Sequence, residues 1–132
     1  MFSTVLRIRG CDGHLMVTLR GELDMVDAAA VAAALMAAAD REARIVVDLA
    51  GLAFVDVTGI TALARARKYA RRAGGDLFLA APRPQLTRLL AIDVLAYRFC
   101  VYASVEEAVS GFRGPLGVAA LRLAPPVIDQ AS

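Results

Sequence analysis

Residues 44–64 place a short apolar strand, a loop and the start of a helix next to one another. The β-branched run at residues 45–49 is typical of a buried strand. From Ile60 onward, apolar residues recur at helical spacing, which predicts an amphipathic helix. We predict a compact loop over residues 50–57 between the two elements. Because a strand that feeds directly into a helix is the building unit of α/β proteins, this stretch constrains the fold more than any other.

The remaining segments extend this alternation of strands and helices. Residues 2–9 and 14–20 are predicted to pair as an antiparallel hairpin, because the Asp-Gly pair between them is typical of a tight turn. The elements predicted after the hairpin are a helix over 26–39, the strand over 45–49, a helix over 58–73, a strand over 76–80, a helix over 84–91, a strand over 99–102 and a helix from Ser104. This order predicts an α/β fold with a mixed, mostly parallel five-stranded sheet and helices packed mainly on one face.

The chain length predicts a single domain followed by a tail. A chain of 132 residues can bury a core without disulfides or metal. Cys11 and Cys100 lie far apart without metal-ligand spacing, and we interpret them as reduced thiols. We place the domain at residues 1–111. Glycine and proline interrupt residues 112–132, which we predict to be a C-terminal tail, either docked or flexible.

Charge and hydropathy patterning argue against two classes of partner. A net charge of +2 gives no reason to expect nucleic-acid binding. The longest apolar run, residues 28–39, is shorter than the roughly 20 residues that a membrane span requires, so we expect no membrane insertion. The N-terminus shows no secretory signal, and we expect a soluble cytoplasmic protein. The abundance of alanine and arginine is a compositional association with bacterial proteins.

The side chains that catalysis requires are missing from the sequence pattern. An enzyme needs a nucleophile with a base, a paired acid and base, a metal, or a cofactor cradle. His14 is the only histidine, and we expect it to be a solvated residue at the start of a strand, with no acid placed to orient it. Neither phosphate-binding glycine motif occurs, and Lys68 lies on a predicted helix rather than after a strand, where receiver domains need a lysine. We therefore expect no catalytic residue, no metal and no cofactor.

A hydroxyl group stands where the central strand gives way to its helix. Asp56, Val57, Thr58 and Gly59 occupy this junction, and a helix N-terminus favours anions or a modified hydroxyl. Thr58 could instead be a helix cap or a turn residue. Asp24 precedes the first helix and is interpreted as its cap, as an acidic wall beside Thr58, or as both.

Basic residues cover one side of the helix that follows Thr58. They could form a solvated face, or a contact surface for an acidic partner. The residues are Arg65, Arg67, Lys68, Arg71 and Arg72.

The stretch VVDLAGLAFVDVTGI resembles the signature of the STAS domain of anti-sigma-factor antagonists, which is a strand, D-L-S-G-V-x-F and then D-S-S-G-[LI]. Residues 21–24, Gly-Glu-Leu-Asp, match the G-E-L-D step before the first helix of that family. Gly74 and Gly75 match the turn before its next strand. The resemblance covers residues 1–111 and implies a STAS-type fold.

The resemblance implies a phosphorylation switch. In the family, the hydroxyl before the glycine is phosphorylated by a serine/threonine kinase that is also an anti-sigma factor, and this position is Thr58 here. The unphosphorylated domain binds the kinase and frees the sigma factor, phosphorylation releases the domain, and a phosphatase resets the switch. The implied partner-binding residues are Asp24, Asp56, Val57, Thr58 and Gly59.

Two departures from the family pattern keep a second interpretation open. Threonine replaces serine at position 58, which keeps the hydroxyl but stiffens the side chain. Val57 replaces the other serine, so one hydroxyl remains in the loop. The alternative is a STAS adaptor without a switch, which would serve a stress-signalling complex or a lipid-transport ATPase.

Overall fold

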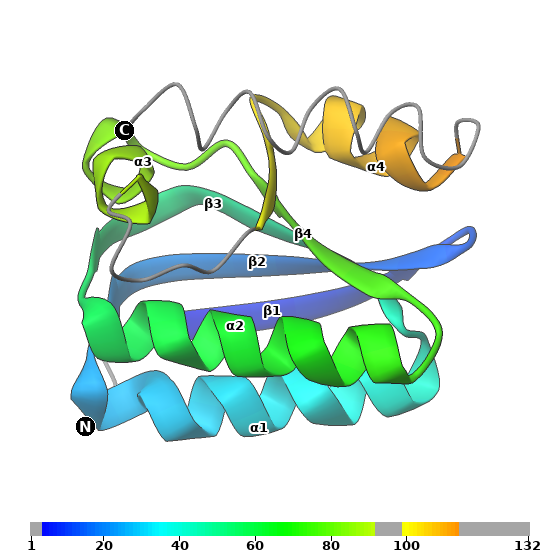
Figure 1. Ribbon diagram of the computed structural model, residues 1–132, viewed down its shortest axis with the longest axis horizontal. Coiled ribbons are helices and arrows are strands. Elements are labelled where there is room, and N and C mark those ends of the chain that lie inside the picture. The colour runs from blue at the N-terminus through cyan, green and yellow to red at the C-terminus, as the bar shows by residue number, and fades with distance from the viewer. Residues whose placement is uncertain (1–3, 92–98, 114–132) are drawn as a thin grey trace.

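The sheet follows the predicted α/β order. The structure, a computed structural model, describes residues 4–91 and 99–113 (Figure 1). The strands are β1 (Thr4–Cys11), β2 (His14–Leu23), β3 (Arg44–Val55), β4 (Asp76–Ala80) and β5 (Cys100–Tyr102), and the helices are α1 (Met25–Arg41), α2 (Val57–Arg72), α3 (Pro84–Leu90) and α4 (Val105–Arg113). The strand order is β1-β2-β3-β4-β5. β1 pairs with β2 antiparallel and the other pairs are parallel, which confirms the predicted mixed five-stranded sheet.

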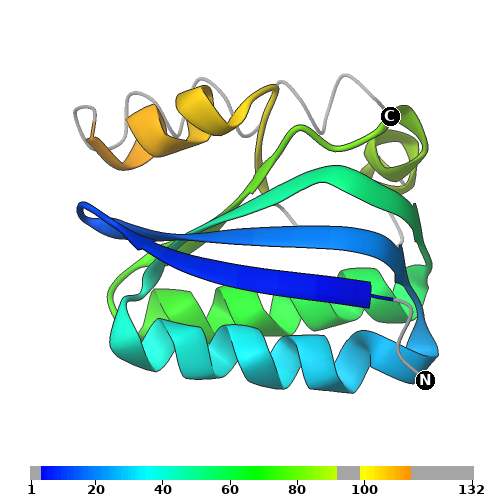
Figure 2. The ribbon, with the colours of Figure 1, turned by 180° about the vertical axis from the view of Figure 1, so that it is seen from behind.

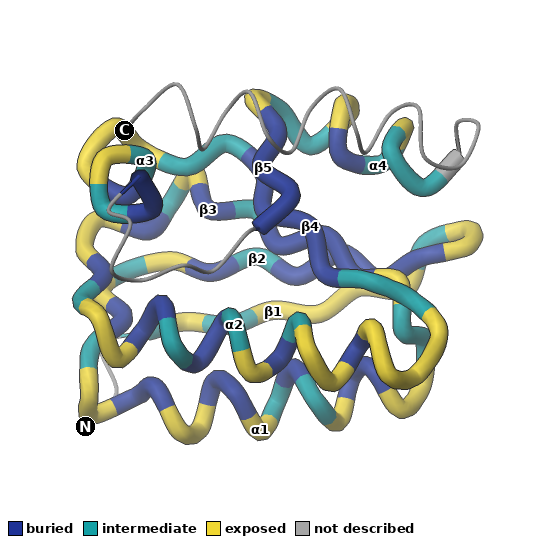
Figure 3. The backbone as a smooth tube through the Cα atoms, viewed as in Figure 1, coloured by how far each residue is buried: buried dark blue, intermediate teal, exposed yellow. Residues whose placement is uncertain are grey.

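The helices divide unequally between the two faces of the sheet. The side chains of α1, α2 and α3 join one cluster of buried residues with the odd-numbered residues of the central strands, such as Val17, Val47 and Leu79. α4 packs on the other face, over a smaller cluster that contains Val46, Phe78 and Tyr102. Figure 1 shows α1 and α2 together on one side of the sheet and α4 on the opposite side, and Figure 3 shows buried residues along the central strands. Helices therefore lie mainly, but not entirely, on one face.

β3 is longer than the sequence predicts. The predicted loop over residues 50–57 is wrong for most of its length, because β3 continues to Val55 and pairs there with Leu23 of β2. The extension keeps Leu52 and Val55 in the core. Two shifts in the register between β2 and β3 accompany it, with the additional residue in β3 each time, and Gly21 lies at one of them with a φ of 95°. A side chain rarely adopts this left-handed backbone, so glycine fits the irregularity.

His14 is buried rather than solvated as predicted. It is 5% exposed, and its Nδ1 atom lies 3.3 Å from the carbonyl oxygen of Asp12. The reason is topological, because β2 lies between β1 and β3 in the interior of the sheet.

The C-terminal prediction falls mostly outside the described residues. Within residues 112–132, the first two belong to α4 and the rest are not described. Among the helices that the structure describes, none combines the length and hydropathy needed to cross a membrane.

Candidate functional site

The N-termini of α1 and α2 lie together at the end of the sheet where β2 and β3 end. Leu23 and Val55 are paired as the last residues of these strands, and an aspartate follows each of them. Asp24 accepts a hydrogen bond from the N–H of Val26 at 3.0 Å and caps α1. Asp56 caps α2 in the same way. The sheet register therefore brings two capped helix N-termini side by side, and the predicted capping role of Asp24 is confirmed.

Thr58 lies in the first turn of α2 with its hydroxyl bonded to the capping carboxylate. Its Oγ1 donates a hydrogen bond to Oδ1 of Asp56 at 2.5 Å, and the same Oδ1 accepts the N–H of Gly59 at 2.9 Å. Asp56 therefore provides the cap that Thr58 could also have provided. Thr58 is exposed, so its hydroxyl can be reached from outside the protein.

The carboxyl group of Asp56 is held in its ionised form. Burial raises its pKa, but hydrogen bonds from the Thr58 hydroxyl and from the N–H groups of Gly59 and Met25 outweigh burial and lower the pKa below its ordinary value. A negative charge is thus fixed beside the Thr58 hydroxyl at neutral pH.

Gly59 is required by packing against the strand ends. A Cβ atom at this position would lie 2.7 Å from Cγ2 of Val55 and 2.8 Å from the carbonyl oxygen of Leu23. Gly59 is itself buried. The lack of a side chain at Gly59 therefore allows α2 to start directly against the ends of β2 and β3, and this contact positions Thr58.

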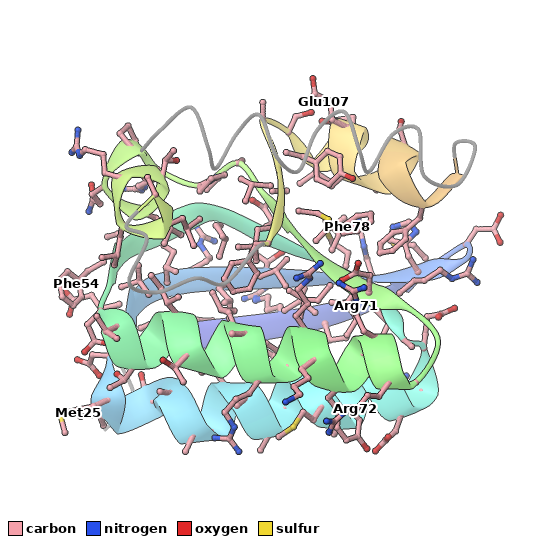
Figure 4. The ribbon with its side chains drawn as sticks, viewed as in Figure 1. Met25, Phe54, Arg71, Arg72, Phe78 and Glu107 are labelled. Carbon is pink, nitrogen blue, oxygen red and sulfur yellow. The ribbon has the colours of Figure 1, made fainter. Side chains whose placement is uncertain are left out.

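Four exposed apolar residues flank the two capping aspartates at the end of the molecule that carries Thr58, and sequence analysis identified one of them. Val57 was predicted, whereas Met25, Val26 and Phe54 were not. The exposed fractions are 74% for Met25, 65% for Val26, 47% for Phe54 and 51% for Val57. Figure 4 shows Met25 and Phe54 at the same end of the molecule. We call these four residues and Thr58 the Thr58 surface. The sequence held one signal that could have identified the other three, because each of the four apolar residues lies within two positions of a capping aspartate.

A shallow groove runs from Thr58 between the two long helices. It has a volume of about 280 Å³ and is lined by Met25, Ala28, Ala29, Thr58, Thr61, Ala62 and Arg65. Of the basic residues on α2, Arg65 reaches this groove. Arg67 instead forms an ion pair with Asp76 at 3.0 Å and is largely buried, so it is not part of a solvated face. A larger hollow of about 740 Å³ lies at the other ends of α1 and α2 and does not include Thr58.

The residues that the structure describes hold no group of three or more potential metal ligands. Asp24 has no hydrogen bond to Thr58 within the same described residues, and its carboxylate instead serves α1. The predicted partner-binding residues are nevertheless brought to one end of the molecule by the two helix starts.

Comparison with known proteins points to one family. The family model of the STAS domain matches residues 6–108 of this chain. BtrV of Bordetella bronchiseptica, which its name assigns to the anti-sigma factor antagonists, is 29% identical over 106 residues, 80% of this chain and 91% of that protein. The solved structure of an anti-sigma factor antagonist from Mycobacterium paratuberculosis is 26% identical, with a TM-score of 0.75, and the match covers 85% of this chain and 96% of that one.

The Bacillus cell-fate determinant SpoIIAA in its phosphorylated form is 19% identical, with a TM-score of 0.61, and the match covers 80% of this chain and 97% of that one. At this identity the likeness concerns the fold alone.

Proposed function

Because this chain belongs to the STAS domain family, whose model matches residues 6–108, we propose that it is an anti-sigma factor antagonist that is switched by phosphorylation of Thr58. In its unphosphorylated form it binds an anti-sigma factor that is also a serine/threonine kinase. Phosphorylation releases it, and a phosphatase restores it. The protein acts in the bacterial cytoplasm as a non-enzymatic regulator of transcription. The observation that carries this proposal is the exposed Thr58 hydroxyl, set among apolar side chains and bonded to an ionised carboxylate.

The Thr58 surface has the composition of a binding site for another protein. Apolar side chains that are exposed on a free domain stabilise a complex when a partner covers them, by about 25 cal/mol for each Å² removed from water. Met25 and Phe54 offer large side chains of this kind. The named relatives support an anti-sigma factor as the partner.

A phosphate at Thr58 would oppose this binding electrostatically. The step forms a bond between Thr58 Oγ1 and the γ-phosphorus of ATP, breaks the bond to ADP and passes the hydroxyl proton to a base of the kinase. The phosphate brings about −1.5 to −2 charges next to the ionised Asp56. This pair of like charges belongs to one domain and is present in the free and in the bound state, so its repulsion does not itself lower the affinity. The affinity falls because a partner that covers the phosphate and Asp56 must remove water from both charges. A hundredfold loss of affinity requires about 2.8 kcal/mol.

The fold should survive phosphorylation with little change. The modified hydroxyl lies at the N-terminus of α2, where the helix dipole and free N–H groups stabilise an anion. The loss of affinity therefore arises at the interface, because the phosphate would have to lose water against an apolar partner surface.

One observation favours the alternative of an adaptor without a switch. The Thr58 hydroxyl already serves the capping carboxylate, so it has a structural role that does not need a kinase. Such a domain would bind its assembly through the same Thr58 surface.

Mass spectrometry after incubation with ATP and the kinase from a neighbouring gene distinguishes the two. The switch predicts one added phosphate on Thr58 that is absent from Thr58→Ala, while Thr61→Ala, whose hydroxyl lies one turn further along α2, remains modified. Absence of any phosphate on the wild-type chain with an active kinase would exclude the switch.

A further inference from the structure

Beyond Thr4, no described element covers the β1 edge of the sheet. β1 is the first strand in the sheet order, and among the described strands it pairs only with β2. It has 8 residues, most of them exposed (Figure 3). β5, at the other edge, has 3 residues that are all buried. Figure 2 shows β1 in front of the sheet, with no helix across it. A strand edge of this kind presents backbone N–H and C=O groups to which another strand can pair.

The hairpin geometry identifies which backbone groups face outward. β1 and β2 are joined by a two-residue turn, across which Cys11 pairs with His14. The pair that closes such a turn is hydrogen-bonded, and the following pairs alternate between bonded and unbonded. The residues whose backbone groups point away from β2 are therefore Thr4, Leu6, Ile8 and Gly10. Thr4 agrees with this alternation, because its N–H donates to the Asp27 carboxylate of α1 at 2.7 Å.

Three arginines lie on one face of the sheet beside this edge. Arg7 is opposite Thr18, and Val5 is opposite Arg20, so Arg7, Arg9 and Arg20 share a face. All three arginines are exposed. Within residues 4–91 and 99–113, no ion pair engages any of them. α4 packs on this face over β3, β4 and β5 and leaves the arginines open.

Two acids share this face of the sheet with the arginines, and neither forms an ion pair with them among the described residues. Glu22 is exposed and follows Arg20 by two residues on β2. Asp48 lies on the same face, but it is two strands from Arg7, which is about 10 Å at the usual strand spacing. Its carboxylate accepts the N–H of Ala50 at 3.0 Å. On the opposite face of β1, Leu6 packs against the core and the apolar side chain of Ile8 is 37% exposed.

We propose that the β1 edge binds an extended acidic segment of a partner protein, in which acidic and apolar side chains alternate. The segment would pair with the outward backbone groups of Leu6, Ile8 and Gly10. Because side chains alternate between the faces of a strand, every second residue would face Arg7 and Arg9 and the others would face Ile8. Charge complementarity selects acids for the first set and apolar residues for the second. This site lies outside the Thr58 surface and does not depend on phosphorylation.

Segments of the chain itself do not fit this site. A second copy of β1 would bring its own Arg7 and Arg9 against those of the first, and like charges directly opposite each other destabilise a strand pair. Residues 114–132 contain Asp129 as their single acid. The arginines thus exclude self-pairing while they favour an acidic strand.

A titration of the full chain with a defined peptide tests the proposal. The probe is a terminally blocked octapeptide of alternating glutamate and valine, whose length matches the 8 residues of β1. Heteronuclear NMR at low salt monitors the titration. We expect the amide signals of Leu6, Ile8 and Gly10 to shift and their hydrogen exchange to slow at least fivefold. Arg7→Glu with Arg9→Glu should weaken binding at least tenfold, whereas Lys68→Glu with Arg72→Glu on α2 should change it less than threefold. Thr58→Glu should leave the binding unchanged.

A proline and a modified backbone test the strand pairing itself. Ile8→Pro removes an outward N–H without removing a bond to β2, and it should weaken binding at least tenfold. If that variant does not fold, the same probe with N-methylated peptide bonds should fail to bind the wild-type chain.

Four results would overturn the proposal. Equal binding of an alternating lysine–valine peptide would remove the charge argument, and full binding by the N-methylated probe would remove the strand pairing. A dimer of the chain that forms through β1, detected by sedimentation, would identify a second copy as the occupant. Binding to phosphatidylserine vesicles that survives in Ile8→Pro would identify a membrane surface instead.

Discussion

The Thr58 hydroxyl and the Asp56 carboxylate lie 2.5 Å apart, and the carboxylate oxygen that accepts from Thr58 also caps α2 through the N–H of Gly59. One oxygen atom thus fixes the start of the helix and fixes a negative charge beside the hydroxyl. Phosphorylation at this position would place two anionic groups on one helix turn. The structural and proposed regulatory roles of Asp56 can be separated by substitution.

Asp56→Ala should lower the free energy of unfolding by about 1 kcal/mol, because the cap of α2 is lost. Asp56→Asn should cost less than that, since asparagine also caps helices. Chemical denaturation at pH 7 measures both. Equal losses in the two variants would show that the charge, and not the cap, stabilises the helix.

The stability that the Asp56 charge contributes should depend on pH in one direction. The pKa of Asp56 is lowered in the folded protein from its ordinary value of 3.8. The contribution is therefore present above the unfolded pKa and is lost as the pH falls through the folded pKa. Unfolding curves of wild type and Asp56→Asn should converge as the pH falls below that range. A difference that grows on acidification would contradict the lowered pKa.

Thr58→Glu should weaken binding of the anti-sigma partner at least hundredfold, because the glutamate charge would have to lose water at the interface. Thr58→Ala should bind the partner with an affinity within a few-fold of wild type, because the apolar side chains of the Thr58 surface remain. Ser110→Glu, an exposed hydroxyl on α4, is the matched control and should bind as wild type. Calorimetry provides the affinities, and circular dichroism checks the fold. Undiminished binding by Thr58→Glu would refute the electrostatic account.

The double variant Met25→Ser with Phe54→Ser should lose partner affinity at least tenfold without loss of stability. Both side chains are largely exposed in the free protein, at 74% and 47%, so their removal costs the core nothing. Val5→Ser, at an equally exposed apolar residue on β1, should bind as wild type. A lower melting temperature in the double variant would show that these side chains stabilise the domain rather than the complex.

Gly59→Ala should lower the free energy of unfolding by about 1–3 kcal/mol, because its methyl group meets a backbone oxygen that cannot turn away. Gly10→Ala, whose methyl would meet nothing closer than 4.0 Å, serves as the control and should be nearly neutral. Thermal unfolding of the two variants compares them directly. If Gly59→Ala is as stable as Gly10→Ala, α2 does not need close contact with the strand ends.

Tyr102→Phe should be neutral or stabilising, because the buried Tyr102 hydroxyl has no hydrogen-bond partner among the described residues. Burial raises the pKa of Tyr102 to about 12. Relative to the ionised phenolate, the neutral phenol favours the folded state. This contribution is fully present when the pH is below the ordinary pKa of 10.0, and it is lost as the pH rises through the folded pKa. Wild type should lose stability between pH 10 and 12 more steeply than Tyr102→Phe, as measured by denaturation over that range.

Local sequence pattern determined the order of elements and the position of the junction. The strand predicted over residues 76–80 is β4 without change, and the helix predicted from Thr58 begins one residue earlier. Asp24 was identified as a cap because caps are set by neighbouring residues. The resemblance of the central stretch to the STAS signature also rests on a short run of neighbouring residues, and the family model confirms it.

Tertiary structure decided the features that depend on contacts between residues far apart in the chain. Residues 50–55 were predicted to form a loop, but pairing with β2 makes them part of β3. His14 is buried in a sheet where another strand lies on each side of β2. Met25 and Phe54 are exposed because none of the described elements covers the start of α1 or the end of β3. The sequence by itself thus determined which residues form helices, strands and caps, since these depend on contacts a few positions away. Which side chains meet around Thr58 depended on sheet register and helix packing, whose contacts join residues far apart in the chain.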